Sequence, residues 1–119
     1  MRLVLVAAAV EPAATGLLLI INPVLFGRLI LGAELSEPGQ ALGRLAGIAL
    51  IALGLACWPV PPNYPASAIG ALLIYNLLAT LYLMHLGVGR RLVGMLLWPA
   101  VVLHSVLAIL IVRAWLVVA

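Results

Sequence analysis

Four long apolar stretches, separated by short breaks rich in proline, glycine or charge, constrain this chain more than any other feature. They cover residues 3–21, 41–58, 66–86 and 92–115. Each has close to the ~20 residues that a helix needs to cross the hydrocarbon core of a bilayer. A backbone in lipid must satisfy its own hydrogen bonds, which favours helices. We therefore predict an all-α integral membrane four-helix bundle with short loops, in which residues 1–119 form one transmembrane domain.

The composition supports a lipid environment. Hydrophobic residues make up 67% of the chain, and only nine side chains are charged, namely six Arg and three Glu. A soluble domain of this size cannot bury so much apolar surface. The net charge of +3 is too small and too scattered for nucleic-acid binding, so we predict membrane lipid as a partner and no nucleic acid. The first stretch continues to Ile21 and is longer than a signal-peptide core, which favours a retained helix.

The arginines predict an orientation in the membrane. With four spans, both chain termini lie on one side, together with Arg2 and Arg113. The other side carries four arginines, at positions 28, 44, 90 and 91. The positive-inside rule then places the termini outside the cytoplasm. Residues 24–31, after the break at Asn22-Pro23, are predicted to form a short interfacial segment.

Small residues on the second stretch predict close helix packing. Gly43 and Gly47 form a GxxxG pattern, and Gly54 follows seven residues later. In lipid, small residues allow helix backbones to approach closely. The pattern fits packing within the chain, and it also fits a dimer interface.

Glu11, next to Pro12, is the most unusual residue of the first stretch. An ionisable group near the bilayer centre costs a few kcal/mol on insertion scales, so it needs a polar partner at the same depth. Counting 1.5 Å of rise per residue brings polar residues of three helices to one level. These residues are Glu11, Thr15, Tyr75, Asn76, His104 and Ser105.

We predict that these six residues form a buried polar cluster centred on Glu11 and His104. A carboxyl group beside an imidazole is the chemistry of proton relays and ion sites, and the pair would titrate together. The same groups also serve as hydrogen-bonding contacts between helices. Tyr75 and Tyr82 lie seven residues apart, and this stripe fits either a ligand cleft or packing.

Motifs for enzyme chemistry are absent from the sequence. The chain has no Asp, no Lys and a single cysteine, Cys57, so an internal disulfide is excluded. It has no Walker loop, GxGxxG, CxxC, HExxH or serine elbow. We therefore predict a protein without enzymatic activity, metal or cofactor.

Three segments carry a resemblance to known proteins. They are Leu42-Gly-Arg-Leu-Ala-Gly-Ile-Ala to Leu-Gly-Leu-Ala-Cys-Trp58, Tyr75-Asn-Leu-Leu-Ala-Thr-Leu-Tyr-Leu83, and Leu97-Trp-Pro-Ala to Leu-His104. In these the chain resembles a group of small bacterial membrane proteins of unknown function. In length and four-helix plan it is similar to DoxX-like membrane proteins. The resemblance implies a bacterial inner membrane and brings no catalytic residue.

Three functions are compatible with these features. The first is an accessory or structural subunit that acts through helix–helix association, as a homo-oligomer or within a larger membrane complex. The second is a small oligomeric proton- or ion-coupled transporter or channel that uses the Glu11–His104 pair. The third is a quinone- or lipid-binding redox subunit.

Overall fold

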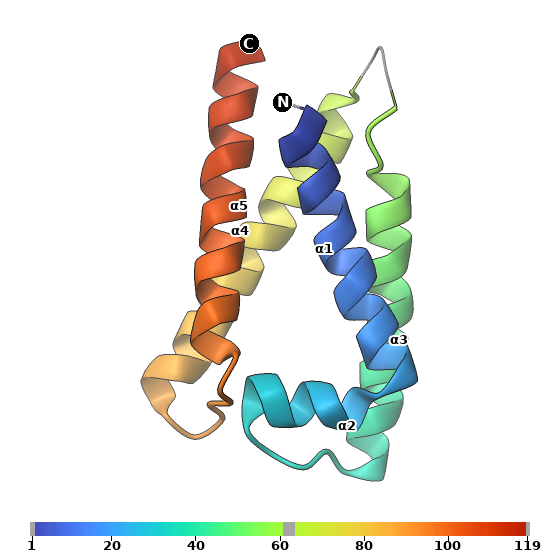
Figure 1. Cartoon of the computed structure of the whole chain (residues 1–119), viewed down its shortest axis with the longest axis vertical. Helices are drawn as coiled ribbons and strands as arrows, with labels where there is room; N and C mark the ends of the chain where they lie inside the picture. Colours follow the sequence, from blue (N-terminus) through green and yellow to red (C-terminus); the bar gives the residue numbers. More distant parts are fainter. Residues whose placement is uncertain (1, 61–63, 119) are drawn as a thin grey trace.

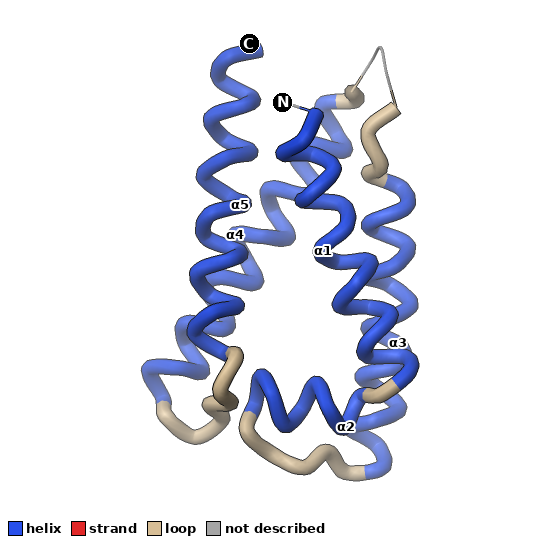
Figure 2. The backbone as a smooth tube through the Cα atoms, viewed as in Figure 1, coloured by secondary structure: helices blue, strands red, loops and turns tan. Residues whose placement is uncertain are grey.

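The computed structural model describes residues 2–60 and 64–118, and every regular element within them is helical (Figure 2). The elements, in chain order, are α1 (Arg2–Ile21), α2 (Pro23–Phe26), η1 (Gly27–Leu31), α3 (Glu37–Ala56), α4 (Ala66–Gly89) and α5 (Leu97–Val118). Four of them, α1, α3, α4 and α5, are long and apolar enough to cross a membrane. The prediction of an all-α fold with four candidate spans is confirmed.

The ends of the spans differ from those predicted at several places. Helix α3 begins at Glu37 rather than 41, because Ser36 caps it: Oγ accepts from the N–H of Gly39 at 3.1 Å. It ends at Ala56 rather than 58. Helix α4 continues to Gly89, where Arg90 turns the chain with a left-handed φ of 59°. Helix α5 begins at Leu97 rather than 92, because the preceding backbone bonds to η1 instead.

The four long helices associate mainly as two pairs. Contacts concentrate in two pairs, α1 with α3 and α4 with α5 (Figure 1). The pairs converge near the chain termini and diverge toward the opposite end. The largest cluster of buried apolar side chains includes Leu5, Leu72, Leu107 and Ile111. These residues come from the converging halves of α1, α4 and α5, so the two pairs share a core at the end with the termini.

The glycines of α3 pack against α1. A Cβ atom on Gly47 would lie 2.5 Å from the carbonyl oxygen of Gly16, and one on Gly54 would lie 2.6 Å from that of Ala9. Gly43 is looser, since its nearest neighbour, Pro23, would be 3.5 Å away. The small-residue face predicted on the second span is therefore occupied within the chain.

The short helical segment formed by α2 and η1 is called the interfacial segment below, after its predicted location. It lies across the end of the molecule where the two pairs diverge, which is called the base (Figure 1). Asn22 turns the chain into it by accepting from the N–H of Leu25 at 3.1 Å. At its other end the carbonyls of Leu29 and Ile30 would lack helical partners. They accept from Leu96 and Gly94 at 2.8 and 2.9 Å. These two bonds tie the base of the α1–α3 pair to the connection before α5.

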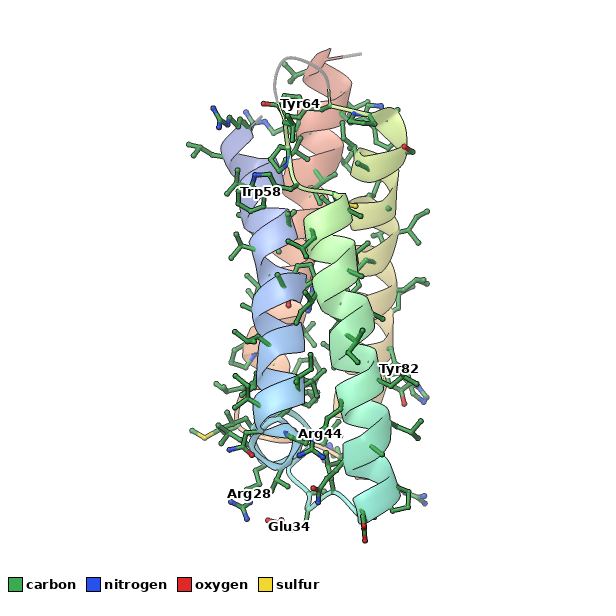
Figure 3. All side chains as sticks on the ribbon, turned by 90° about the vertical axis from the view of Figure 1, so that its right-hand side faces the viewer. Arg28, Glu34, Arg44, Trp58, Tyr64 and Tyr82 are labelled. Carbon is green, nitrogen blue, oxygen red and sulfur yellow. The ribbon has the colours of Figure 1, made fainter. Side chains whose placement is uncertain are left out.

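Charged side chains gather at the end of the molecule opposite the chain termini, which is called the charged end below. Arg28, Glu34 and Arg44 lie at the end that carries the interfacial segment, whereas Trp58 and Tyr64 lie at the other end (Figure 3). Arg44 donates from Nε to the carbonyl of Ile20 at 3.2 Å, and Glu34 binds Arg28. The distribution agrees with arginines and aromatic residues at the two interfaces of a bilayer.

Candidate functional site

Glu11 lies midway along α1, and its side chain is only 11% exposed. Thr15, one helical turn later, donates its hydroxyl to Oε1 of Glu11 at 2.9 Å. Nε2 of His104, on α5, lies 3.6 Å from the same oxygen. The second oxygen, Oε2, is buried and has no hydrogen-bond partner among the described residues. The carboxyl group is therefore held from one side, and its bonding capacity is not filled.

His104 is oriented by Asn76 on α4. Nδ2 of Asn76 donates to the carbonyl of Leu72 at 2.8 Å, which turns its Oδ1 toward His104. Nδ1 of His104 lies 2.9 Å from that Oδ1. Because a carboxamide oxygen only accepts, Nδ1 must carry a hydrogen, as the bonding pattern assigns it. In a neutral ring, Nε2 is then the unprotonated nitrogen, and it faces Glu11.

The interaction between Glu11 and His104 depends on whether a proton lies between them. With none between them, a lone pair of Nε2 would face a carboxylate oxygen in an apolar interior. One proton on either group removes that repulsion and makes the pair neutral overall, as an acid beside an imidazole or as an ion pair. Nε2 of His104 and Oε1 of Glu11 lie 3.6 Å apart, which is longer than a hydrogen bond.

The remaining residues of the predicted cluster fall into two groups. Tyr75 joins the site: its ring meets that of His104 edge to face, with centroids 5.5 Å apart. Ser105 is different, because its hydroxyl donates to the carbonyl of Val101 within α5 at 2.7 Å. Five of the six predicted residues, Glu11, Thr15, Tyr75, Asn76 and His104, thus meet around one point.

A cavity of about 430 Å³ adjoins the cluster, in the space where the helix pairs diverge. Its polar residues are Glu11, Thr15, Tyr75 and His104, with Tyr82 further along α4. The rest of the wall is apolar and comes from α2, η1, α3, α4, α5 and the connection before α5; it consists of Phe26, Ile30, Leu50, Ala79, Leu83, Leu96, Pro99, Ala100 and Leu103. Ligand cavities in proteins commonly measure about 300–1,000 Å³ and share this mostly apolar character.

The cavity is open at its side, where exposed residues of α4 and α5 line it. Tyr82 and Leu103 line it and are 62% and 46% exposed. Toward the charged end it is bordered by Phe26 and Ile30 of the interfacial segment, which the bonds to Gly94 and Leu96 hold in place. If the four helices span a bilayer, this opening faces the lipid acyl chains.

Sequence reasoning found the polar residues of the site and missed its apolar wall. Phe26 and Ile30 were assigned to an interfacial segment, but nothing in the sequence showed that this segment closes a cavity. Leu50 lies between the packing glycines Gly47 and Gly54 on α3, yet it lines the cavity. Apolar residues in a membrane chain look alike whether they face lipid, a neighbouring helix or a cavity.

The described residues contain no group of three His, Cys, Asp or Glu side chains that could hold a metal ion. No family model, no curated protein and no solved structure matches the chain. The fold and the site together define an all-helical protein with four candidate membrane spans and an apolar cavity between two helix pairs, with polar side chains at one end of the cavity.

Proposed function

We propose that the protein is a membrane-embedded binding protein for a lipid-soluble small molecule. One observation carries the proposal: an apolar cavity of about 430 Å³ ends in the buried pair Glu11 and His104. Burial of an ionisable group such as the Glu11 carboxyl in a membrane span is costly, so such a group marks a candidate functional site. The cavity gives it a use, since a few polar groups at the end of an apolar cavity orient a ligand. This proposal keeps the lipid-binding side of the third sequence hypothesis and needs no chemistry of the protein's own.

Ion transport is supported less well by the cavity. A proton or ion path needs polar groups from the Glu11–His104 pair to a membrane face. Toward the charged end, Tyr82 is the one polar side chain among the described residues of the cavity wall, and it lies beside the apolar Phe26, Ile30 and Leu96. The three apolar side chains offer no hydrogen bond, so the geometry favours a ligand that arrives through lipid.

An accessory-subunit role is the second candidate, and the outer face of α3 supports it. Gly47 and Gly54 face α1, but Ala46, Ala49, Ala52 and Ala56 are exposed. Small residues on a lipid-facing surface suit association with another membrane helix. A binding protein that delivers its ligand to a larger complex would combine both roles.

We further infer that the protein resides in a bacterial inner membrane, with both termini outside the cytoplasm. The arginines at positions 28, 44, 90 and 91 are all exposed, and they lie near the ends of the candidate spans on one side. The positive-inside rule supports a cytoplasmic location for that end. Accessibility of a cysteine introduced at Ser67 or at Gly89 to a membrane-impermeant reagent tests the orientation.

Identification of co-purified small molecules tests the proposed function. The protein is extracted gently from its own membranes, and native mass spectrometry compares the wild type with Ala100→Phe, which places a ring in the cavity. We expect an apolar ligand on the wild type and its loss from Ala100→Phe. Ala46→Phe, on the exposed face of α3, is the matched control and should keep the ligand. Equal occupancy in all three proteins would refute a role for the cavity.

A further inference from the structure

The polar and apolar parts of the cavity are arranged along the helix axes. Glu11, Tyr75 and His104 lie near the middle of their helices, whereas the wall toward the charged end is apolar apart from Tyr82. We propose that the ligand is a neutral lipid-soluble molecule with a hydroxyl group, and that this hydroxyl lies against the Glu11–His104 pair near the centre of the bilayer. This inference rests on the proposed function and names the chemical class of its ligand.

The neutrality of the ligand follows from the charge of the site. Glu11 and His104 carry no net charge when they share one proton, and no Arg is among the described residues that line the cavity. A charged head group would lose its hydration there without a counter-charge, which is costly. A phospholipid also has its head group at the interface, about half a bilayer away from these residues. The site therefore fits a molecule whose polar group is small enough to reside among acyl chains.

The preference for a hydroxyl follows from the bonding capacity of the pair. Among the described residues, only Thr15 lies within hydrogen-bond distance of the Glu11 carboxyl, and Oε2 lacks a partner. The last dihedral of a glutamate side chain has a broad energy profile, so rotation can turn either oxygen toward the cavity. A hydroxyl can donate to this carboxyl group and also accept a hydrogen bond from the acid form or from Tyr75. A carbonyl or an ether can only accept.

The route of entry agrees with a lipid-soluble ligand. The exposed side chains of Tyr82 and Leu103 flank the opening, and the interfacial segment covers the base. A molecule dissolved in the acyl chains can enter sideways, with its hydroxyl leading and its apolar body against Phe26 and Ile30. It would not pass through water.

A matched pair of probes tests this inference on the wild-type protein. 4-Octylphenol and its methyl ether differ only in the hydroxyl hydrogen and a methyl group. Radiolabelled probe is partitioned between empty lipid nanodiscs and nanodiscs that contain the protein, so that the preference of each probe for lipid cancels. We expect the phenol to bind about tenfold more tightly than the ether, as the loss of one hydrogen bond to a carboxyl group in an apolar site implies.

The outcomes separate the inference from the proposed function. Equal binding of phenol and ether would overturn the inference and leave the cavity as a binding site. Tighter binding of the cationic analogue 4-octylbenzylamine than of the phenol would overturn neutrality in the same way. If nanodiscs that contain the protein retain neither the phenol nor the ether better than empty nanodiscs do, the proposed function itself is contradicted.

Glu11→Met, which keeps the length of the side chain but removes both oxygens, should abolish the preference for the phenol. Glu37→Met is the matched control, because Glu37 is exposed at the start of α3 and lines no part of the cavity. Its preference should equal that of the wild type. If Glu11→Met does not fold, the two probes on the wild type still decide the question.

Discussion

Asn76 on α4 fixes the orientation of the His104 ring on α5, with Oδ1 of the amide 2.9 Å from Nδ1 of the imidazole. Both side chains are buried, and Asn76 is itself held by the carbonyl of Leu72. The bond decides which ring nitrogen faces Glu11. A residue without direct contact to the carboxyl group thus sets the protonation pattern of the site.

We expect Asn76→Leu to release this constraint. Nδ1 would lose its acceptor, and the proton of the neutral ring could move between the two nitrogens. Loss of the buried bond should lower the free energy of unfolding by about 0.5–2 kcal/mol. Nitrogen NMR of the labelled His104 ring in lipid measures the tautomer directly.

Thr80→Val is the control for Asn76→Leu, because the Thr80 hydroxyl donates only to the backbone carbonyl of Asn76. It should leave the His104 spectrum unchanged. An Nδ1–H population in Asn76→Leu equal to that of the wild type would show that Asn76 does not set the tautomer.

The close approach of α1 and α3 predicts opposite effects for two glycine substitutions. A methyl group on Gly47 would lie 2.5 Å from the carbonyl oxygen of Gly16, so the backbones must separate. We expect Gly47→Ala to destabilise the protein by about 1–3 kcal/mol. At Gly70, also inside a helix, the nearest atom would be a Trp115 ring carbon at 3.8 Å. Gly70→Ala should therefore be neutral or stabilise by up to about 1 kcal/mol, through helix propensity.

Unfolding of both glycine variants in mixed micelles, followed by circular dichroism, compares them. Equal stability of the two would mean that the α1–α3 contact is not close. Lower stability of Gly70→Ala than of Gly47→Ala would contradict the geometry directly.

The sequence was sufficient to predict the helical class, the number of candidate spans and most of the polar cluster. Span length and helical rise determine these features, and both can be counted. The divergence of the helix pairs could not be predicted, because it depends on where Gly47 and Gly54 direct α3 and on the backbone bonds of Gly94 and Leu96. Ser105 was assigned to the cluster by depth alone, but its hydroxyl bonds within its own helix. Depth gives the level of a side chain, whereas the direction it faces depends on packing.

Gly94 supports the base of the cavity. Its N–H donates to the carbonyl of Ile30, and a Cβ atom there would clash with the backbone of Leu29. We expect Gly94→Ala to break the link between the interfacial segment and the start of α5. Hydrogen exchange measured by mass spectrometry should then rise in peptides that cover residues 94–96.

Gly89→Ala is the control for Gly94→Ala, since a Cβ atom at position 89 would meet nothing within 4 Å. It should not change exchange at residues 94–96. Unchanged protection in Gly94→Ala would show that the two backbone bonds are not needed to hold the base.

Arg28 and Glu34 form an exposed ion pair outside the candidate spans, with 2.5 Å between Nε and Oε1. The hydrogen bond to Glu34, and then its charge, raise the pKa of Arg28 above its ordinary value. A raised pKa stabilises the folded state below the unfolded pKa, and this contribution is lost only as pH rises through the folded pKa. For arginine both lie far above neutral pH.

Titration of Arg28 should therefore contribute no pH dependence to stability near neutral pH. We expect Glu34→Gln to shift the unfolding midpoint little, and by the same amount at every pH between about 6 and 9. Thermal unfolding across this range checks the expectation. A difference between wild type and Glu34→Gln that changes with pH would contradict it.

The coupling between Glu11 and His104 can be measured by a double-mutant cycle with Glu11→Met, His104→Met and the double variant. Glu11→Met leaves Nε2 of His104 without its partner, and His104→Met leaves both Glu11 and the Asn76 amide facing an apolar side chain. In the double variant, no carboxyl group is left facing an apolar side chain, and the Asn76 oxygen and the Thr15 hydroxyl lose their partners. Because a buried polar group without a partner costs more than the removal of both partners, the double variant should be more stable than His104→Met alone.

We expect a coupling free energy of about 0.5–3 kcal/mol. Additive effects would mean that the 3.6 Å contact carries no interaction, and that each group is satisfied separately.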